Sequence, residues 1–110
     1  MEKVLQDRIA LVTGGAQGLG EAICHRLAKE GCHVVVADLN EEKAIQTAES
    51  ITASTDRRAF AVKVDVSDEA QVEDMGNRCV KEFGRLDIMV ANAGILIAEE
   101  ITEFPAEKWR

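Results

Sequence analysis

The sequence predicts an α/β fold with a parallel sheet and helices on both faces, and three observations support this prediction. Short apolar runs rich in β-branched residues alternate with longer stretches in which apolar residues recur at helical spacing. A turn that is nearly half glycine joins the first run to the first helical stretch, and polar or small residues follow each later run. Strands and helices that alternate in this way connect by right-handed crossovers, so neighbouring strands run parallel.

The first strand is predicted at residues 9–12, where a continuous apolar run is typical of a strand buried on both faces. A helix is expected over residues 21–29, and Gly31 stands where a helix C-cap belongs. A second β-branched run at residues 32–37 predicts the next strand, which ends on Asp38. The inner side of the helix is expected to hold Ala22, Ile23, Leu27 and Ala28.

The second helix is predicted to begin after Asn40, a residue type that commonly caps helices. The polar residues 52–58 are expected to form a connection. A third strand over residues 59–64 closes on Asp65 and Val66. Apolar residues of the helix recur at helical spacing and predict its buried side, namely Ala44, Ala48 and Ile51.

The third helix is predicted to begin after Ser67, a second residue type that caps helices, and to end at Gly84. A fourth strand over residues 86–90 then leads into a short polar segment at residues 91–94. The buried stripe of the helix is expected to consist of Val72, Gly76, Cys79, Val80 and Phe83.

Four strands joined by three helices predict a three-layer, doubly wound, Rossmann-type sheet with strand order 3-2-1-4, of which the chain supplies the N-terminal half. In such sheets a ligand binds beyond the carboxyl ends of the strands, where the strand order reverses. That point lies between strands 1 and 4. Every notable polar or glycine segment follows a strand directly, which places all of them at this one edge of the sheet.

The glycine-rich turn predicts a phosphate site. Gly14 lets the chain leave the strand sharply, Gly18 removes a side chain that would hold a ligand away from the backbone, and Gly20 permits close packing of the helix. The free N–H groups and the positive dipole end of the following helix favour an anion above the strand. The alternative is that these glycines form only a flexible turn.

Asp38 lies 18 residues beyond Gly20, close to the interval of roughly 20 residues at which an acid reaches the adenosine ribose in dinucleotide sites. A carboxylate there accepts hydrogen bonds from the ribose hydroxyls and repels a 2′-phosphate. The neighbouring Leu39 and Asn40, and Gln17 in the glycine-rich turn, are not basic. The sequence therefore predicts NAD as the cofactor, with a merely solvated loop aspartate as the alternative.

The turn Thr13-Gly14-x-x-x-Gly18-x-Gly20 resembles the cofactor motif of the short-chain dehydrogenase/reductase family. Asp65 and Val66 resemble the pair with which this family holds the adenine, although Asp65 could also serve only in a turn before the helix cap. Residues 92–94 resemble the family's Asn-Asn-Ala-Gly element, with Ala91 in place of its first Asn. The expected cofactor site comprises Gly14, Gln17, Gly18, Leu19, Gly20, Asp38, Leu39, Asp65, Val66, Asn92, Ala93 and Gly94.

The resemblance implies that residues 1–110 form the NAD-binding Rossmann domain of an oxidoreductase that transfers a hydride between NAD(H) and an alcohol/ketone pair. The family's catalytic Ser, Tyr, Lys and Asn have no counterpart here, and the chain holds no tyrosine. We therefore expect the catalytic half to be absent and the 110-residue piece to be inactive by itself. The amino-acid sequences of residues 84–87 and 101–105 are most similar to those of polyol dehydrogenases, which implies a sugar alcohol or its phosphate as substrate.

A second class of function stays open, namely a dinucleotide-binding or regulatory module without catalysis of its own. A methyltransferase-type Rossmann domain is a more distant alternative, because its glycine loop is usually shorter and its ligand has no pyrophosphate. The predicted strand order also makes strand 4 an edge in this piece, so we expect the isolated chain to self-associate there. The parent is expected to be a homo-oligomer.

Composition excludes several partners. Acidic residues outnumber basic ones by 20 to 13, and the net charge of −7 disfavours nucleic acid and anionic membranes. No apolar run approaches the roughly 18 residues of a membrane span, and no signal-peptide core follows Met1, so a cytoplasmic protein is expected. His25 and His33 have no partners at metal-ligand spacing, so no metal site is predicted. The cysteines show no Cys-x-x-Cys spacing and are expected to be free thiols in or near the core, namely Cys24, Cys32 and Cys79.

Overall fold

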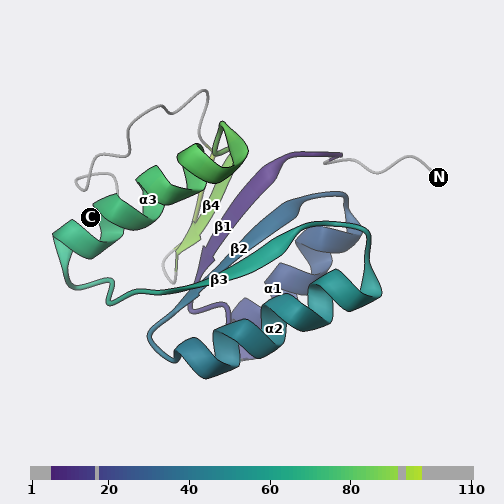
Figure 1. Cartoon of the computed structure of the whole chain (residues 1–110), viewed down its shortest axis with the longest axis horizontal. Helices are drawn as coiled ribbons and strands as arrows, with labels where there is room; N and C mark the ends of the chain where they lie inside the picture. Colours follow the sequence, from purple (N-terminus) through teal and green to yellow (C-terminus); the bar gives the residue numbers. More distant parts are fainter. Residues whose placement is uncertain (1–5, 17, 92–93, 98–110) are drawn as a thin grey trace.

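The computed structural model describes residues 6–16, 18–91 and 94–97, which form three helices and five strands. One sheet holds all the strands in the order β3-β2-β1-β4-β5, so the predicted order 3-2-1-4 is confirmed (Figure 1). In chain order the elements are β1 (Ile9–Thr13), α1 (Gly18–Lys29), β2 (His33–Asp38), α2 (Glu41–Ser54), β3 (Ala59–Lys63), α3 (Glu69–Phe83), β4 (Ile88–Ala91) and β5 (Gly94–Ile97).

Helices cover both faces of the sheet, as the three-layer prediction requires. α1 and α2 lie on one face and α3 lies on the other (Figure 1). Alternate residues of β1 point to opposite faces, because side chains alternate along a strand. Ala10 and Val12 join the core under α1 and α2, whereas Ile9 and Leu11 join the core under α3. All of β1 is buried, which explains why its sequence is a continuous apolar run.

β4 is not an edge strand in the described part of the chain. It pairs in parallel with β1 on one side and in antiparallel fashion with β5 on the other, where Ala91 lies opposite Gly94. The expectation of an open edge at strand 4 is therefore wrong, and the four parallel strands gain one antiparallel neighbour, β5. An apolar run directly after a strand can fold back on it, because antiparallel neighbours need no crossover helix, and this pairing satisfies the edge's backbone groups.

The cap of α3 is Asp68 and not Ser67. The Asp68 carboxylate accepts hydrogen bonds from the N–H groups of Ala70 and Gln71, at 3.0 and 3.3 Å. The Ser67 hydroxyl donates instead to the Asp65 carboxylate at 2.6 Å, so it is not available to the helix. Gly84 ends α3 in the left-handed region, with φ of 84°, as predicted.

The other helices also differ from prediction in detail. Asn40 caps α2 as expected, but α2 extends through Ser54, three residues into the predicted connection. The hydroxyls of Thr52 and Ser54 donate to carbonyls four residues earlier, which satisfies these polar side chains within the last turn. In α1 the buried residues are Cys24 and Ala28, while Ala22 is exposed. In α3, Met75 joins the buried residues Val72, Gly76 and Cys79, with Val80 and Phe83 partly buried.

A buried carboxylate connects β1 to the segment before β4 at the amino ends of the strands. Asp87 is 2% exposed, and its Oδ2 accepts the Ile9 N–H at 2.8 Å. The Asp87 N–H donates in return to the Ile9 carbonyl at 2.9 Å. The half-exposed guanidinium groups of Arg8 and Arg85 flank the same carboxylate. The Asp87 carboxylate thus interacts with the backbone of β1 and with two arginines of the protein.

A second polar cluster lies at the same amino-terminal end. The Nδ1 atom of His33 accepts the Arg58 N–H at 2.9 Å, and the imidazole ring stacks on Phe83 with centroids 5.7 Å apart. Asp7 lies 3.6 Å from His33 Nε2 and also pairs with Arg57. This cluster joins the start of β2 to the start of β3.

Candidate functional site

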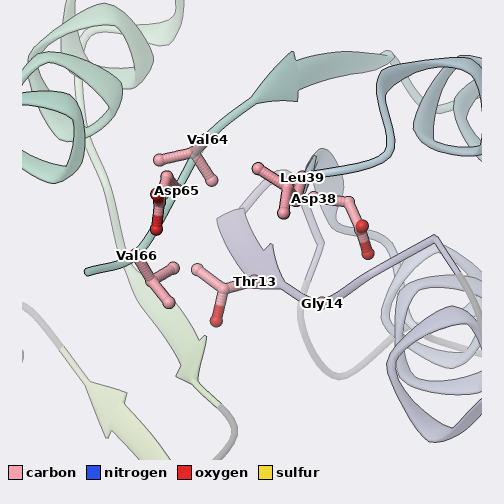
Figure 2. Close-up of a pocket in the computed structure, with 7 residues that line it drawn as sticks. All are labelled: Thr13, Gly14, Asp38, Leu39, Val64, Asp65 and Val66. Atoms are coloured by element: carbon pink, nitrogen blue, oxygen red, sulfur yellow. The ribbon is translucent and has the colours of Figure 1, made fainter. Parts of the chain in front are cut away.

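A pocket of about 350 Å³ opens at the carboxyl ends of β1, β2 and β3. Figure 2 shows residues 64–66 on one side of the pocket and Asp38 and Leu39 on the other, with the Asp38 carboxylate turned away from residues 64–66. The structure thus brings five predicted site residues together, and it adds two residues that the expected site did not include. The five predicted residues are Gly14, Asp38, Leu39, Asp65 and Val66, and the additional ones are Thr13 and Val64.

The remaining predicted site residues have different positions. Gly18, Leu19 and Gly20 form the first turn of α1 and do not line this pocket. Gly94 is the first residue of β5. The other three predicted residues, Gln17, Asn92 and Ala93, lie outside the described residues.

The pocket lies beside the predicted switch point, on its β2 and β3 side. Between β1 and β4 the Thr13 hydroxyl donates to the Val90 carbonyl at 3.3 Å, and Thr13 is almost fully buried. This bond connects the base of the glycine-rich turn to β4. A ligand reaching both the pocket and the switch point would therefore lie across the end of β1.

Asp38 occupies the centre of the site because it ends β2 beside the glycine-rich turn. Its Oδ2 accepts the Ala16 N–H at 3.1 Å, and its Oδ1 accepts the Asn40 N–H at 2.9 Å. The described residues place no Lys or Arg within 4.0 Å of this carboxylate. Each carboxylate oxygen has two acceptor positions, so Asp38 can accept further hydrogen bonds from a ligand.

Asp65 follows β3 and is held by the start of the α3 segment. Its Oδ1 accepts two hydrogen bonds from Ser67, from the N–H at 3.0 Å and from the hydroxyl at 2.6 Å. These bonds hold the pKa of the Asp65 carboxyl below its usual value, and the hydroxyl makes the larger contribution. The Asp65 N–H donates to Gln71 Oε1 at 2.9 Å. Asp65 is therefore an ionised acceptor in a fixed position at neutral pH.

The glycines of the turn have distinct steric roles. Gly14 and Gly18 have positive φ angles of 67° and 58°, which side chains rarely adopt. A Cβ atom on Gly18 would meet nothing within 4 Å, so the space above its backbone is open. A Cβ atom on Gly20 would lie 1.9 Å from the Gly14 carbonyl oxygen, so α1 starts directly against the beginning of the turn. The turn thus presents bare backbone at Gly18 and is closely packed at Gly20.

Apolar side chains surround this polar site. Of the four large hydrophobic residues that are exposed in the described chain, three are predicted site residues. Leu39 and Val66 line the pocket, with exposed fractions of 63% and 52%, and Leu19 is 77% exposed in the first turn of α1. Exposed apolar side chains beside convergent polar groups are typical of a small-molecule site.

Two other kinds of site find no support in the part of the chain that the structure describes. No group of three His, Cys, Asp or Glu side chains is arranged to hold a metal ion there. None of the three helices combines the length and the apolar character that crossing a membrane requires.

A family model described as short chain dehydrogenase matches residues 8–110. The uncharacterized oxidoreductase YuxG of Bacillus subtilis (strain 168) is 43% identical over 109 residues, which are 98% of this chain and 16% of YuxG. Meso-2,3-butanediol dehydrogenase of Serratia marcescens is 36% identical over 104 residues, which are 94% of this chain and 40% of that protein.

A solved structure leads to the same family. A short chain dehydrogenase/reductase from Burkholderia phymatum, determined in complex with NAD, superposes with a TM-score of 0.74 at 27% sequence identity. The alignment covers 81% of this chain and 31% of that protein, so the chain spans less than half the length of each relative named here. Because the family model matches nearly the whole sequence and the strand order agrees, this chain belongs to the short chain dehydrogenase family.

Proposed function

We propose that this chain is the NAD-binding part of an oxidoreductase that transfers a hydride between NAD(H) and an alcohol/ketone pair. The observation that carries the proposal is the position of the Asp38 carboxylate, which stands between the glycine-rich turn and the pocket that Asp65 and Val66 line. An acid at the end of β2, beside bare glycine backbone, suits a ribose joined to a pyrophosphate.

The residues present fit such a cofactor. Asp38 would accept hydrogen bonds from the ribose, and the open backbone at Gly18 would face the pyrophosphate. Leu39 and Val66 would cover the faces of a flat adenine ring, with Asp65 as acceptor for its amino group. NAD, when bound, supplies the hydride acceptor, whereas this chain supplies binding and orientation. The acid/base groups would come from other parts of the parent protein.

NAD is expected to bind more tightly than NADP. Hydrogen bonds from ribose hydroxyls to the Asp38 carboxylate are worth about 1.5–3 kcal/mol, and a 2′-phosphate would face a like charge. One structural feature opposes this preference. Lys63 lies opposite Asp38 in the pairing of β2 with β3, on the exposed edge strand, although no ion pair within 4.0 Å joins them. A lysine in this register could attract a 2′-phosphate.

Cofactor titrations of the full-length parent test the assignment. We expect at least tenfold tighter binding of NAD than of NADP, which corresponds to about 1.4 kcal/mol. Asp38→Ala should narrow this ratio, Lys63→Gln should widen it, and Glu49→Gln, which removes a charge from the exposed side of α2, should leave it unchanged. Equal affinities for the two cofactors in the unmutated protein would show that Asp38 does not select the cofactor.

The substrate part of the proposal is an alcohol with a neighbouring hydroxyl, such as a sugar alcohol or its phosphate. The amino-acid sequences of residues 84–87 and 101–105 support a polyol substrate, and one relative is named for a vicinal diol. NADH absorbance with the full-length parent, followed on a panel of polyols and polyol phosphates, is the test. Turnover of simple monoalcohols alone would contradict the polyol class.

A binding module without catalysis is the second candidate. It is favoured by the described pocket, whose groups suit the binding of an adenosine diphosphate. Tight NAD binding by the full-length parent without NAD-linked turnover of any alcohol or ketone would support the module. Turnover would support the enzyme.

A further inference from the structure

Asp38 connects three separate segments at the carboxyl edge of the sheet. Its carboxylate accepts the N–H groups of Ala16, in the glycine-rich turn, and of Asn40, the cap of α2. Its backbone carbonyl accepts the Val64 N–H at 3.1 Å, directly before the Asp65 segment. The glycine-rich turn, the start of α2 and the segment after β3 therefore all bond to Asp38.

Aspartate is chemically suited to this position. The Asn40 N–H and the Ala16 N–H donate to different oxygens of the carboxylate, so two acceptor atoms on a short side chain are needed. An asparagine has one acceptor oxygen and one donor NH₂ group, so it can satisfy only one of the two N–H groups. An alanine has no acceptor at all, so in Asp38→Ala the N–H of Ala16, which is 5% exposed, would lose its acceptor.

The neighbouring amide behaves differently, which isolates the contribution of Asp38. The Gly15 N–H donates to the backbone carbonyl of Ala37 at 3.2 Å and does not depend on any side chain. Two successive amides of the turn are thus held by β2, one through its backbone and one through Asp38. Side-chain substitution at Asp38 removes only the second.

We propose that Asp38 is a positioning residue that holds the glycine-rich turn in its binding shape before any cofactor arrives. The same carboxylate that would accept the ribose hydroxyls then sets the backbone that would receive the pyrophosphate. Recognition of these two parts of the ligand is therefore coupled through one side chain. This coupling rests on the proposed function, whereas the positioning of the turn does not.

Amide-resolved hydrogen exchange on the cofactor-free, full-length protein tests the positioning. In Asp38→Ala, protection of the Ala16 amide should fall at least tenfold, while protection of the Gly15 amide changes much less. Glu49→Gln serves as the matched control for loss of one negative charge and should change neither amide. Unchanged protection at Ala16, or equal losses at Ala16 and Gly15, would overturn the proposal, because the carboxylate would then not position the turn through its hydrogen bond to Ala16.

Ligand titration tests the coupling. Adenosine carries adenine and ribose without phosphate, and ADP adds a diphosphate. Comparing the two probes therefore separates the effect of the Asp38 carboxylate on ribose binding from its effect on diphosphate binding. Asp38→Ala should weaken ADP about tenfold more than it weakens adenosine. Equal losses for the two probes would overturn the coupling. If neither probe binds the unmutated protein, the proposed function fails, while the exchange result still decides whether Asp38 positions the turn.

Discussion

At the amino ends of the strands carboxylates face arginines, whereas at the carboxyl ends they face backbone N–H groups. Asp87 lies between Arg8 and Arg85, and Asp7 pairs with Arg57. Asp38 and Asp65 instead accept hydrogen bonds from the backbone or hydroxyl groups of nearby turns. Both ends belong to the same strands, so the difference comes from the residues that flank each strand.

Under the proposed function, this difference separates the residues that stabilise the sheet from those that bind the cofactor. At the amino ends the carboxylates of Asp7 and Asp87 face arginines, and the buried Asp87 also satisfies the backbone of β1. At the carboxyl ends the described carboxylates keep negative charge and free acceptor positions beside a pocket. A parallel sheet permits this division because all its strands present the same chemical end to the same edge.

The largest predicted effect runs against this division, because a substitution at the carboxyl ends of the strands lowers the stability of the fold. Gly20→Ala places a Cβ atom 1.9 Å from the Gly14 carbonyl oxygen, so backbone must move on one side or the other. We expect the free energy of unfolding to fall by about 3 kcal/mol, measured by chemical denaturation. A loss below about 1 kcal/mol would mean that α1 can shift away from the turn at little cost.

Asp87→Ala sharpens the comparison from the other end. It leaves the buried Ile9 N–H without an acceptor, so the free energy of unfolding should fall by about 2 kcal/mol. NAD affinity should stay unchanged, since Asp87 lies at the opposite edge of the sheet from the pocket. Asp56→Ala is the control, because it removes an exposed carboxylate at the same end and should cost about 0.5 kcal/mol or less. Weakened NAD binding in Asp87→Ala would show that the two ends are coupled.

Gly18→Ala should show the opposite pattern to Asp87→Ala. The added methyl group meets no protein atom, so only the positive φ angle opposes it, at a cost of about 1 kcal/mol. NAD affinity should fall at least tenfold, because the methyl group occupies the open space that the pyrophosphate would enter. Thermal melting and NAD titration on one preparation give both values. Retained affinity would mean that Gly18 serves only the shape of the turn.

The smallest predicted effect is a pH dependence at the amino end. Burial, with a smaller contribution from the Arg57 charge, lowers the pKa of His33 below its usual 6.5. The folded protein therefore takes up this proton less readily than the unfolded chain does, so the stabilisation by neutral His33 is complete above pH 6.5. It is lost as the pH falls through the lower, folded-state pKa. Denaturation midpoints should thus decrease from pH 7 toward pH 5.

His33→Asn provides the control for this pH dependence. Asparagine offers an acceptor near the position of Nδ1 but does not titrate, so it can still accept the Arg58 N–H. The decrease between pH 7 and pH 5 should be smaller in the variant than in the unmutated protein. An identical decrease in both would assign the effect to other groups.

The fold could be predicted from the sequence because the pattern of strands and helices is repeated and locally consistent. Four apolar runs at regular intervals are enough to predict the strand order, and the glycine spacing predicts a site at the end of the strands where the structure has a pocket. The pairing of β5 with β4 could not be predicted in this way. Four apolar residues after a strand have no periodicity that would distinguish a loop from a short strand.

The details of the site depended on competition between similar residues. Nearby backbone could bond to any of three side chains, those of Asp65, Ser67 and Asp68. Only their arrangement in space shows that the Ser67 hydroxyl bonds to Asp65 and that Asp68 caps α3. The role of Asp87 was also missed. A single aspartate beside an apolar run was itself a signal, because a charge at such a position has to be paired when it is buried.

The three cysteines offer chemical reporters for local opening of this fold. None of the three forms a disulfide in the described structure and all are buried, and burial raises the pKa of the thiols of Cys24 and Cys79 to about 12 and that of Cys32 to about 11. Since only the thiolate reacts appreciably with alkylating reagents, the closed structure should be almost inert to maleimides. Cys24 belongs to α1 and Cys79 belongs to α3, and the two thiols are buried in the cores on opposite faces of the sheet. Their separate labelling rates would therefore report how often each helical layer detaches from the sheet, without adding any probe to the sequence.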